Sequence, residues 1–232
     1  MRYGMTSKKS LKLDEKERFI GELNELKEGL RQLGIEYDRS VLERFRIYLE
    51  VLHNYKDKVH LLSHRDYNRI ARRHFVTSLT AFKYVKRFKY ICDIGAGAGF
   101  PSIPLRILLP DIDLTLFESR RKKVRFLNHL IDHLGLMHTR VVNGRAEDYK
   151  ERKFEVVLLK AVGRIKKMVK AIDHLIEPQG IAIFYKTHRI EEELRAAAAV
   201  LEKKHFRIRT EKLFTPLENL PLALVILEKF QG

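Results

Sequence analysis

A glycine-rich run headed by an acidic residue is the clearest candidate for chemistry in the sequence. The run Asp93-Ile94-Gly95-Ala96-Gly97-Ala98-Gly99 follows a short apolar segment and precedes a stretch compatible with a helix. Its glycines can turn tightly and let a ligand lie directly against the backbone. A dinucleotide fingerprint, G-x-G-x-x-G, requires glycine at the position that Phe100 occupies. The loop therefore favours S-adenosylmethionine, whose zwitterionic amino-acid portion needs close backbone contacts, over a nicotinamide or flavin cofactor.

Two further expected strand ends carry residues that suit the same ligand. Glu118 ends the second strand, at the spacing where a carboxylate accepts two ribose hydroxyls. The turn Gly144-Arg145-Ala146-Glu147-Asp148 follows the third strand, where backbone groups and a polar side chain normally hold an adenine. We expect the three strand ends to form one cofactor pocket. The residues expected to bind the cofactor are Asp93, Gly95, Ala96, Gly97, Gly99, Phe100, Glu118, Ser119, Arg145, Ala146 and Glu147.

The elements that must position these loops alternate between short apolar or β-branched runs and helical segments, a pattern typical of parallel βαβ units. Strands are predicted at Tyr90–Ile94, Asp113–Glu118, Thr139–Val142, Val156–Lys160 and Gly180–Lys186. Helices are predicted at Ile103–Leu109, Arg120–Leu134, Ile165–Leu175 and Ile190–Lys203. Two last strands, Phe206–Leu213 and Leu222–Lys229, have no helix between them and should pair antiparallel. This α/β order, a mostly parallel seven-stranded sheet with a C-terminal antiparallel hairpin, is that of the Rossmann-like class I methyltransferases.

The N-terminal part reads as a helical extension. Residues 1–12 are basic and lack apolar periodicity, so they are expected to form a flexible arm. Helices are predicted over Asp14–Leu33, from the N-cap Asp38 to about Tyr55, and over Asp66–Lys86 with a break near His74. We therefore expect a basic helical extension over residues 1–88 and a catalytic domain over residues 89–232.

The charge balance favours a polyanionic partner. The 232 residues carry a formal net charge of +16, so RNA, DNA and an anionic membrane surface all qualify. Basic residues are densest between Lys56 and Lys89, where only Asp57 and Asp66 oppose them. More basic residues lie in the first turn of the helix predicted after Glu118, where positive charge opposes the helix dipole. The expected RNA-binding residues are Arg69, Arg72, Arg73, Arg120, Arg121 and Lys123.

Other classes of protein are disfavoured. No stretch approaches the roughly 18 to 20 consecutive apolar residues of a membrane span, and the N-terminus lacks an apolar signal region. A cytoplasmic protein without membrane partners is expected. The single cysteine, Cys92, excludes an internal disulfide and should be a buried, inert thiol. His129 and His133 have ligand-like spacing but no accompanying carboxylate motif, so no metal is expected.

Five motifs resemble those of one known family. The run Asp93–Pro104 is similar to its D-[VI]-G-[TS]-G-x-G-[FL]-P-G-[IL]-P, and Arg145-Ala146-Glu147 is similar to its R-x-E. Glu118-Ser119 with Lys122, Lys123, Phe126 and Leu127 is similar to the family's D-S-x-x-K-R-x-x-F-L. Upstream, Leu61-Leu62-Ser63 is similar to its N-L-[TV] element, and Arg73-His74 with Ser78 is similar to its R-H-x-x-D-S element. The family is RsmG (GidB), which methylates N7 of a guanine in small-subunit (16S) ribosomal RNA.

The resemblance implies S-adenosylmethionine as cofactor and ribosomal RNA or the small ribosomal subunit as partner; a monomer is favoured. It spans about Val41 to Lys229. The chain departs from the family pattern on the face where RNA should approach. Thr77 stands where the family has aspartate, Leu159-Lys160-Ala161 where it has S-R-A, and Thr187 where it has glycine after Lys186. A basic residue expected near Leu222 is absent. Two alternatives therefore stay open: a paralogue that methylates another RNA or a small molecule, and a non-catalytic RNA-binding assembly factor.

The residues near the expected methyl group suit a ring nitrogen as the target atom. Guanine N7 carries an exposed lone pair and no proton, so the reaction needs positioning but no general base. Methylation of pyrimidine carbon-5 would require a cysteine nucleophile. Methylation of an exocyclic amine would require an N/D-P-P-aromatic turn, and methylation of a 2′-hydroxyl would require a Lys-Asp-Lys-Glu set. None of these is present at the expected positions. Lys160 and Lys186 are the expected catalytic residues, at neighbouring strand ends, where they would grip RNA phosphate or guanine O6.

Overall fold

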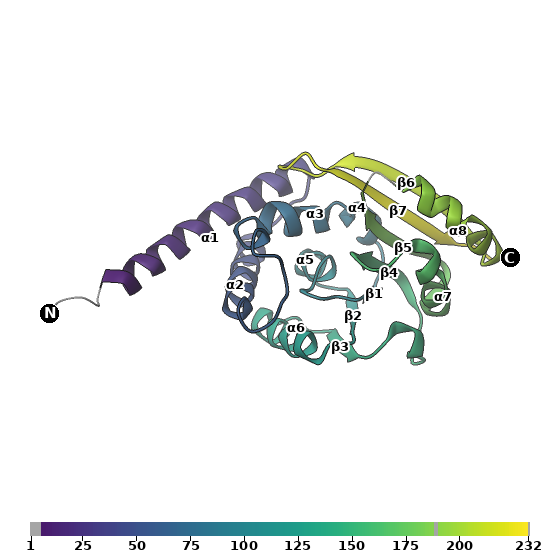
Figure 1. Ribbon diagram of the computed structural model, residues 1–232, viewed down its shortest axis with the longest axis horizontal. Coiled ribbons are helices and arrows are strands. Elements are labelled where there is room, and N and C mark those ends of the chain that lie inside the picture. Colours follow the sequence, from purple (N-terminus) through teal and green to yellow (C-terminus); the bar gives the residue numbers. More distant parts are fainter. Residues whose placement is uncertain (1–5, 188–189, 232) are drawn as a thin grey trace.

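The computed structural model describes residues 6–187 and 190–231, with side chains from residue 17 onward. Its centre is a seven-stranded sheet in the order β3-β2-β1-β4-β5-β7-β6 (Figure 1). The strands are β1 Tyr90–Ile94, β2 Asp113–Glu118, β3 Thr139–Asn143, β4 Phe154–Lys160, β5 Ile176–Lys186, β6 Phe206–Phe214 and β7 Pro221–Lys229. β1 to β5 pair in parallel, whereas β7 is antiparallel to β5 and β6. The predicted sheet and C-terminal hairpin are thus confirmed.

Helices cover both faces of the sheet. Those described are α1 Thr6–Gln32, α2 Arg39–Tyr55, α3 Val76–Leu79, α4 Phe82–Val85, α5 Ser102–Leu108, α6 Arg121–Leu134, α7 Ile165–Leu175 and α8 Glu191–Lys203. One apolar core joins the sheet to α1, α2, α3, α5 and α6, and a second core joins the other face to α7 and α8. The side chains of successive strand residues point to opposite faces, so each central strand contributes to both cores.

The N-terminal helices pack on the sheet through their apolar stripes. Asp38 caps α2 as predicted, since its carboxylate accepts a hydrogen bond from the Val41 amide at 3.0 Å. Buried residues of α2, including Phe45 and Leu49, belong to the same core as the sheet. Cys92 is a free, buried residue of β1, as expected.

Two predictions about the N-terminal part are wrong. The arm expected over residues 1–12 is helical from Thr6, because no glycine or proline interrupts the chain between Thr6 and Ile20; residues 1–5 lie outside the described residues. The helix expected over Asp66–Lys86 is a series of short turns: a 3-10 turn Asp66–Asn68, a π-turn Ala71–Phe75, α3 and α4.

A side chain from α1 explains how the π-turn begins. The buried carboxylate of Glu22 accepts hydrogen bonds from the amides of Ile70 and Ala71, so it caps the turn in place of a local residue. Burial raises the pKa of Glu22 to about 6. α1 therefore fixes the start of the segment that carries the predicted RNA-binding arginines.

Candidate functional site

The carboxyl ends of β1, β2 and β3 meet at one cavity. Its volume is about 180 Å³, and its lining includes Gly95, Glu118, Ser119 and the turn Gly144–Glu147. The adjacent, parallel order of the three strands brings these segments together. The structure thus places in one pocket the three strand ends that the sequence singled out. Their contacts to a cofactor stay predictions.

Glu118 is fixed in this cavity by backbone amides. Its carboxylate accepts hydrogen bonds from the amides of Gly97 at 3.1 Å and Arg120 at 2.8 Å, one on each oxygen. Each carboxylate oxygen keeps a further lone pair for a ligand hydroxyl. The side-chain amide of Asn143 donates to the carbonyls of Glu118 and Ser119, which holds the two strand ends together. The sequence prediction ended β3 at Val142 and missed Asn143.

The glycine loop is shaped to accept a ligand. Gly97 has a φ of 58°, and a Cβ placed on it would make only ordinary contacts, with the Gly95 carbonyl at 3.7 Å and Lys123 Nζ at 3.8 Å. Tyr48 of α2 donates its hydroxyl to the Ala98 carbonyl at 2.6 Å and braces the far side of the loop. Tyr48 lies about 50 residues from the loop in sequence. It appears on an ordinary apolar helix stripe, so no local signal identifies it.

Asp93 lies buried beneath the loop. One of its oxygens accepts a hydrogen bond from the Ser102 hydroxyl at 2.5 Å, and the other oxygen has no partner among the described residues. Burial raises the pKa of Asp93 to about 7. A buried acceptor without a partner, beneath a glycine loop that lines the second cavity, fits a ligand that brings an ammonium group. The amino-acid portion of S-adenosylmethionine carries such a group, so the residues present fit this cofactor.

A second cavity of about 300 Å³ lies next to the first, and Gly95 lines both. Loop residues Gly95 to Ala98 form one wall. The remaining lining residues are Leu61, Leu62, Ser63, Asp66, His74, Phe100, Lys123, Lys160 and Ala161. Asp66, Lys123 and Lys160 bring charged groups beside the glycine loop. The second cavity is therefore the candidate site for a target base.

Lys160 is held in the second cavity by two aromatic side chains. Its Nζ lies 3.4 Å from His74 Nδ1 and 5.4 Å from the ring centroid of Phe100. The His74 ring stacks on Phe100, with centroids 4.9 Å apart. Burial and nearby Lys160 lower the pKa of His74 to about 3, so the neutral ring can accept a hydrogen bond from the ammonium. Burial lowers the pKa of Lys160 to about 8.

Lys186 does not share this cavity. The strand register pairs Lys160 with Tyr185, so Lys186 points to the opposite face of the sheet. Its Nζ donates to the Gly163 carbonyl at 2.8 Å and pairs with Glu193 of α8 at 3.0 Å. The two lysines therefore do not lie beside the same methyl group, contrary to the prediction. Lys186 is one residue further along its strand than the partner of Lys160, so its side chain points to the other face of the sheet. A catalytic role for Lys186 stays a prediction.

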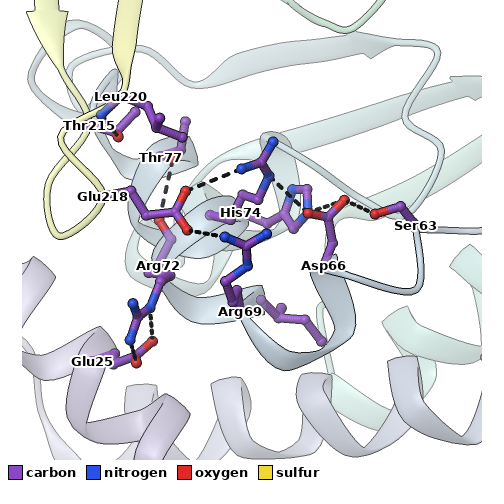
Figure 2. Close-up of polar contacts among 12 residues, drawn as sticks. Glu25, Ser63, Asp66, Arg69, Arg72, His74, Thr77, Thr215, Glu218 and Leu220 are labelled. Carbon is purple, nitrogen blue, oxygen red and sulfur yellow. Dashed lines mark hydrogen bonds and ion pairs between the residues drawn. The ribbon is translucent and has the colours of Figure 1, made fainter.

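The predicted RNA-binding residues divide into two sets. Arg120 and Arg121 are exposed at the start of α6, and Lys123 lines the second cavity. In contrast, Arg72 pairs with Glu25 of α1, whereas Arg69 and Arg73 pair with Glu218 in the turn between β6 and β7 (Figure 2). The sequence had offered only nearby Asp57 and Asp66 as opposing charges. RNA binding by either set stays a prediction.

The departures at Thr77 and Leu222 lie away from both cavities. Thr77 is buried, and its hydroxyl donates to the Arg72 carbonyl at 3.5 Å. Leu222 belongs to the apolar core of β7. Of the family departures identified in the sequence, Lys160 is the one that lines the second cavity among the residues that the structure describes.

Comparisons with known proteins decide the family. The model of the GidB family, described as rRNA small subunit methyltransferase G, matches residues 41–216. The chain belongs to the GidB family. It is 32% identical over 211 residues to the ribosomal RNA small subunit methyltransferase G of Lachnoclostridium phytofermentans, covering 87% of each chain. It is 31% identical to the same-named protein of Bacillus subtilis, with 90% of this chain and 91% of that protein covered.

Solved structures agree on the fold of this GidB family member. An S-adenosylmethionine-dependent O-methyltransferase from Thermotoga maritima aligns with a TM-score of 0.55 at 12% identity, covering 80% of this chain and 72% of that one. P. horikoshii TYW2, solved in complex with MeSAdo, aligns with a TM-score of 0.55 at 15% identity, covering 68% and 63%. The predicted class I methyltransferase fold, the family and dependence on S-adenosylmethionine are confirmed.

Proposed function

We propose that the protein transfers a methyl group from S-adenosylmethionine to N7 of a guanine in small-subunit (16S) ribosomal RNA. The observation that carries the proposal is the pair of adjacent cavities at the carboxyl edge of the sheet. One has the carboxylate and backbone groups that suit an adenosyl ligand, and the other has room and charge for a base. Family membership supports the ribosomal substrate.

The chain's own residues would bind and orient the two reactants. Glu118 would accept the ribose hydroxyls, the turn Gly144–Glu147 would hold the adenine, and the glycine loop with Asp93 would hold the amino-acid portion. When bound, the cofactor supplies a methyl group already activated by its sulfonium. Lys160 would donate a hydrogen bond to guanine O6 or an RNA phosphate, since its Nζ lies in the second cavity.

No proton has to leave the target atom, which suits the groups in the second cavity. His74 is neutral at physiological pH, and Lys160 is mostly protonated below pH 8. Neither group is therefore arranged as a general base at neutral pH. Catalysis then rests on holding N7 in line with the methyl group, an effect that proximity makes worth several kcal/mol.

The remaining features of the proposal concern RNA and location. Residues 1–88 would form an extension that helps to hold RNA, with Arg120, Arg121 and Lys123 beside the second cavity. Within the described residues, no helix is both long and apolar enough to span a bilayer. We place the protein in the cytoplasm, where it would act as a monomer on ribosomal RNA or the small subunit.

Nucleoside analysis tests the proposal. Ribosomal RNA from a strain that lacks the gene should lose 7-methylguanosine from its 16S fraction, and the wild-type gene should restore it. A gene carrying Glu118→Ala should not restore it. An unchanged 7-methylguanosine content would favour the alternative, a paralogue with another substrate. The observation that supports this alternative is Lys160, which stands where the family's S-R-A has arginine.

A further inference from the structure

Carboxylates hold the three arginines of the 69–73 segment in two different ways (Figure 2). Arg72 makes a two-pronged contact with Glu25, through Nε at 2.8 Å and through Nη2. Arg69 and Arg73 each contact one oxygen of Glu218, at 3.5 and 3.4 Å. Charged hydrogen bonds of this kind normally measure about 2.7 to 2.9 Å. Glu218 is therefore held loosely, whereas Arg72 is held tightly.

Glu218 reaches the arginines from a turn with unfavourable backbone geometry. Its side chain is 8% exposed, although it lies at the tip of the β6–β7 hairpin. The residues on either side of it, Leu217 and Asn219, have φ values of 69° and 50°. A left-handed conformation is unfavourable for leucine, because its Cβ crowds the backbone. The contact with the arginine pair helps to keep the turn in this conformation.

The arginine pair lies beside the second cavity. Arg73 uses its Nε to bind Asp66 at 2.8 Å, and Asp66 lines that cavity together with His74. The side chains of Arg69 and Arg73 are 41% and 40% exposed, so part of each is open to solvent. An anion bound here would therefore lie next to the place where a target base would enter.

We propose that Arg69 and Arg73 form a binding site for a phosphodiester group of the RNA substrate, and that Glu218 fills this site in the free protein. The inference rests on the proposed function. A phosphodiester resembles a carboxylate in bearing one negative charge and two free oxygens that match guanidinium groups. Arg72 is not part of the site, because it is turned toward α1, where Glu25 occupies the edge formed by its Nε and Nη2.

RNA has an advantage over Glu218 that a single phosphate lacks. The hairpin keeps Glu218 at an effective concentration of order millimolar, so an isolated phosphate competes poorly. An RNA strand binds other cations at the same time, including the exposed Arg120 and Arg121, and releases counterions from several phosphates. Binding of RNA to Arg69 and Arg73 should then free the turn that carries Glu218.

The test compares two single-charge variants in binding to 16S ribosomal RNA at fixed salt. Glu218→Gln removes the competing carboxylate with little change of shape, and Glu192→Gln removes an exposed carboxylate from α8 as the matched control. We expect Glu218→Gln to raise RNA affinity about 10-fold and Glu192→Gln to raise it less than about 2-fold. Adding Arg69→Gln and Arg73→Gln to the Glu218→Gln protein should cancel the gain. Equal affinities for the two single variants would overturn the proposal.

Amide hydrogen exchange in the wild-type protein gives a second test that needs no variant. The turn is closed by hydrogen bonds from the Thr215 amide to the Leu220 carbonyl, at 2.8 Å, and from the Asn219 amide to the Thr215 carbonyl, at 3.0 Å. RNA should accelerate exchange of these amides, and unchanged or slower exchange would contradict release of the turn.

Methyl transfer to 16S RNA, measured on the same samples, separates the two proposals. If the wild type transfers methyl groups but Glu218→Gln and Glu192→Gln bind RNA equally well, only the phosphodiester site is rejected. Absence of transfer with a selective gain for Glu218→Gln rejects only the proposed function.

Discussion

The two cavities at the carboxyl edge of the sheet are built in different ways. The one at the ends of β1, β2 and β3 is formed by a short run of residues at each strand end, and backbone amides hold its carboxylate, Glu118. The other is completed by side chains from distant segments, including Asp66, His74 and Lys160. Backbone geometry thus dominates the cofactor side, and side-chain contacts dominate the target side.

This difference suggests how each side can vary. A site built from backbone tolerates few changes in its glycines but accepts many changes elsewhere. A site built from side-chain pairs can change partner by partner. The family departure at Lys160 lies on the target side, while the glycine loop and Glu118 keep cofactor-compatible residues. Substitutions on the two sides should therefore separate cofactor affinity from methyl transfer.

The largest expected effect is on the cofactor side. Gly97→Val should lower S-adenosylmethionine affinity by more than about 100-fold, because a β-branched side chain strains the left-handed backbone and adds bulk to the loop that lines the second cavity. Titration calorimetry measures this directly. Gly21→Ala, in α1 and with open space around its Cα, is the control and should keep wild-type affinity. Wild-type affinity in Gly97→Val would show that the cofactor lies elsewhere.

On the target side, Lys160→Met should lower kcat/KM for RNA methylation by about 10- to 100-fold, the effect of losing a charged hydrogen bond. S-adenosylmethionine should still bind, because Lys160 is not among the residues that line the first cavity. Lys160→Arg, which restores the residue typical of the family, should keep most of the activity. Equal losses in both lysine variants would argue against a donor role.

The pH dependence of cofactor binding offers a finer test. The pKa of Asp93 is raised to about 7, so in the free protein this group contributes stability at low pH that is lost as pH rises through 7. Cofactor binding should show the opposite trend, since an ammonium group favours the ionised carboxylate. Affinity should rise about 5-fold between pH 6 and pH 7, a range in which the cofactor's own amino group stays mostly protonated. Calorimetry in buffers of different ionisation enthalpy should detect proton release; a flat affinity profile would exclude Asp93 from the cofactor site.

The smallest expected effect separates Arg72 from its neighbours. Arg72→Gln should cost about 0.5 to 1 kcal/mol of unfolding free energy, because its ion pair with Glu25 is partly exposed. RNA affinity should stay within about 2-fold of wild type, after correction for one unit of charge. Denaturant unfolding and RNA binding measure the two effects. A loss of RNA affinity equal to that of Arg69→Gln would place Arg72 in the RNA site.

Sequence patterns predicted the elements that depend on short-range order. The bounds of β1, β2 and α7 agree with prediction, because alternation of apolar residues, helical periodicity and flanking breakers act within a few residues. The three strand ends were also predictable, since parallel order alone brings them to one edge. The cap at Asp38 follows from the same local chemistry.

Contacts between distant segments were not predictable. The Glu22 cap on Ile70 joins residues 48 apart, and the Arg73–Glu218 pair joins residues 145 apart. Each partner has an ordinary composition for its own element. The face on which Lys186 lies depends on strand register, which a difference of one residue reverses.

Titration of S-adenosylmethionine into the wild-type protein tests most directly whether the ends of β1, β2 and β3 hold this cofactor. One molecule should bind per chain, and Glu118→Ala should weaken binding by about 10-fold or more, because it removes a charged acceptor. No detectable binding to the wild-type protein at about 1 mM ligand, or unchanged binding to Glu118→Ala, would contradict this placement.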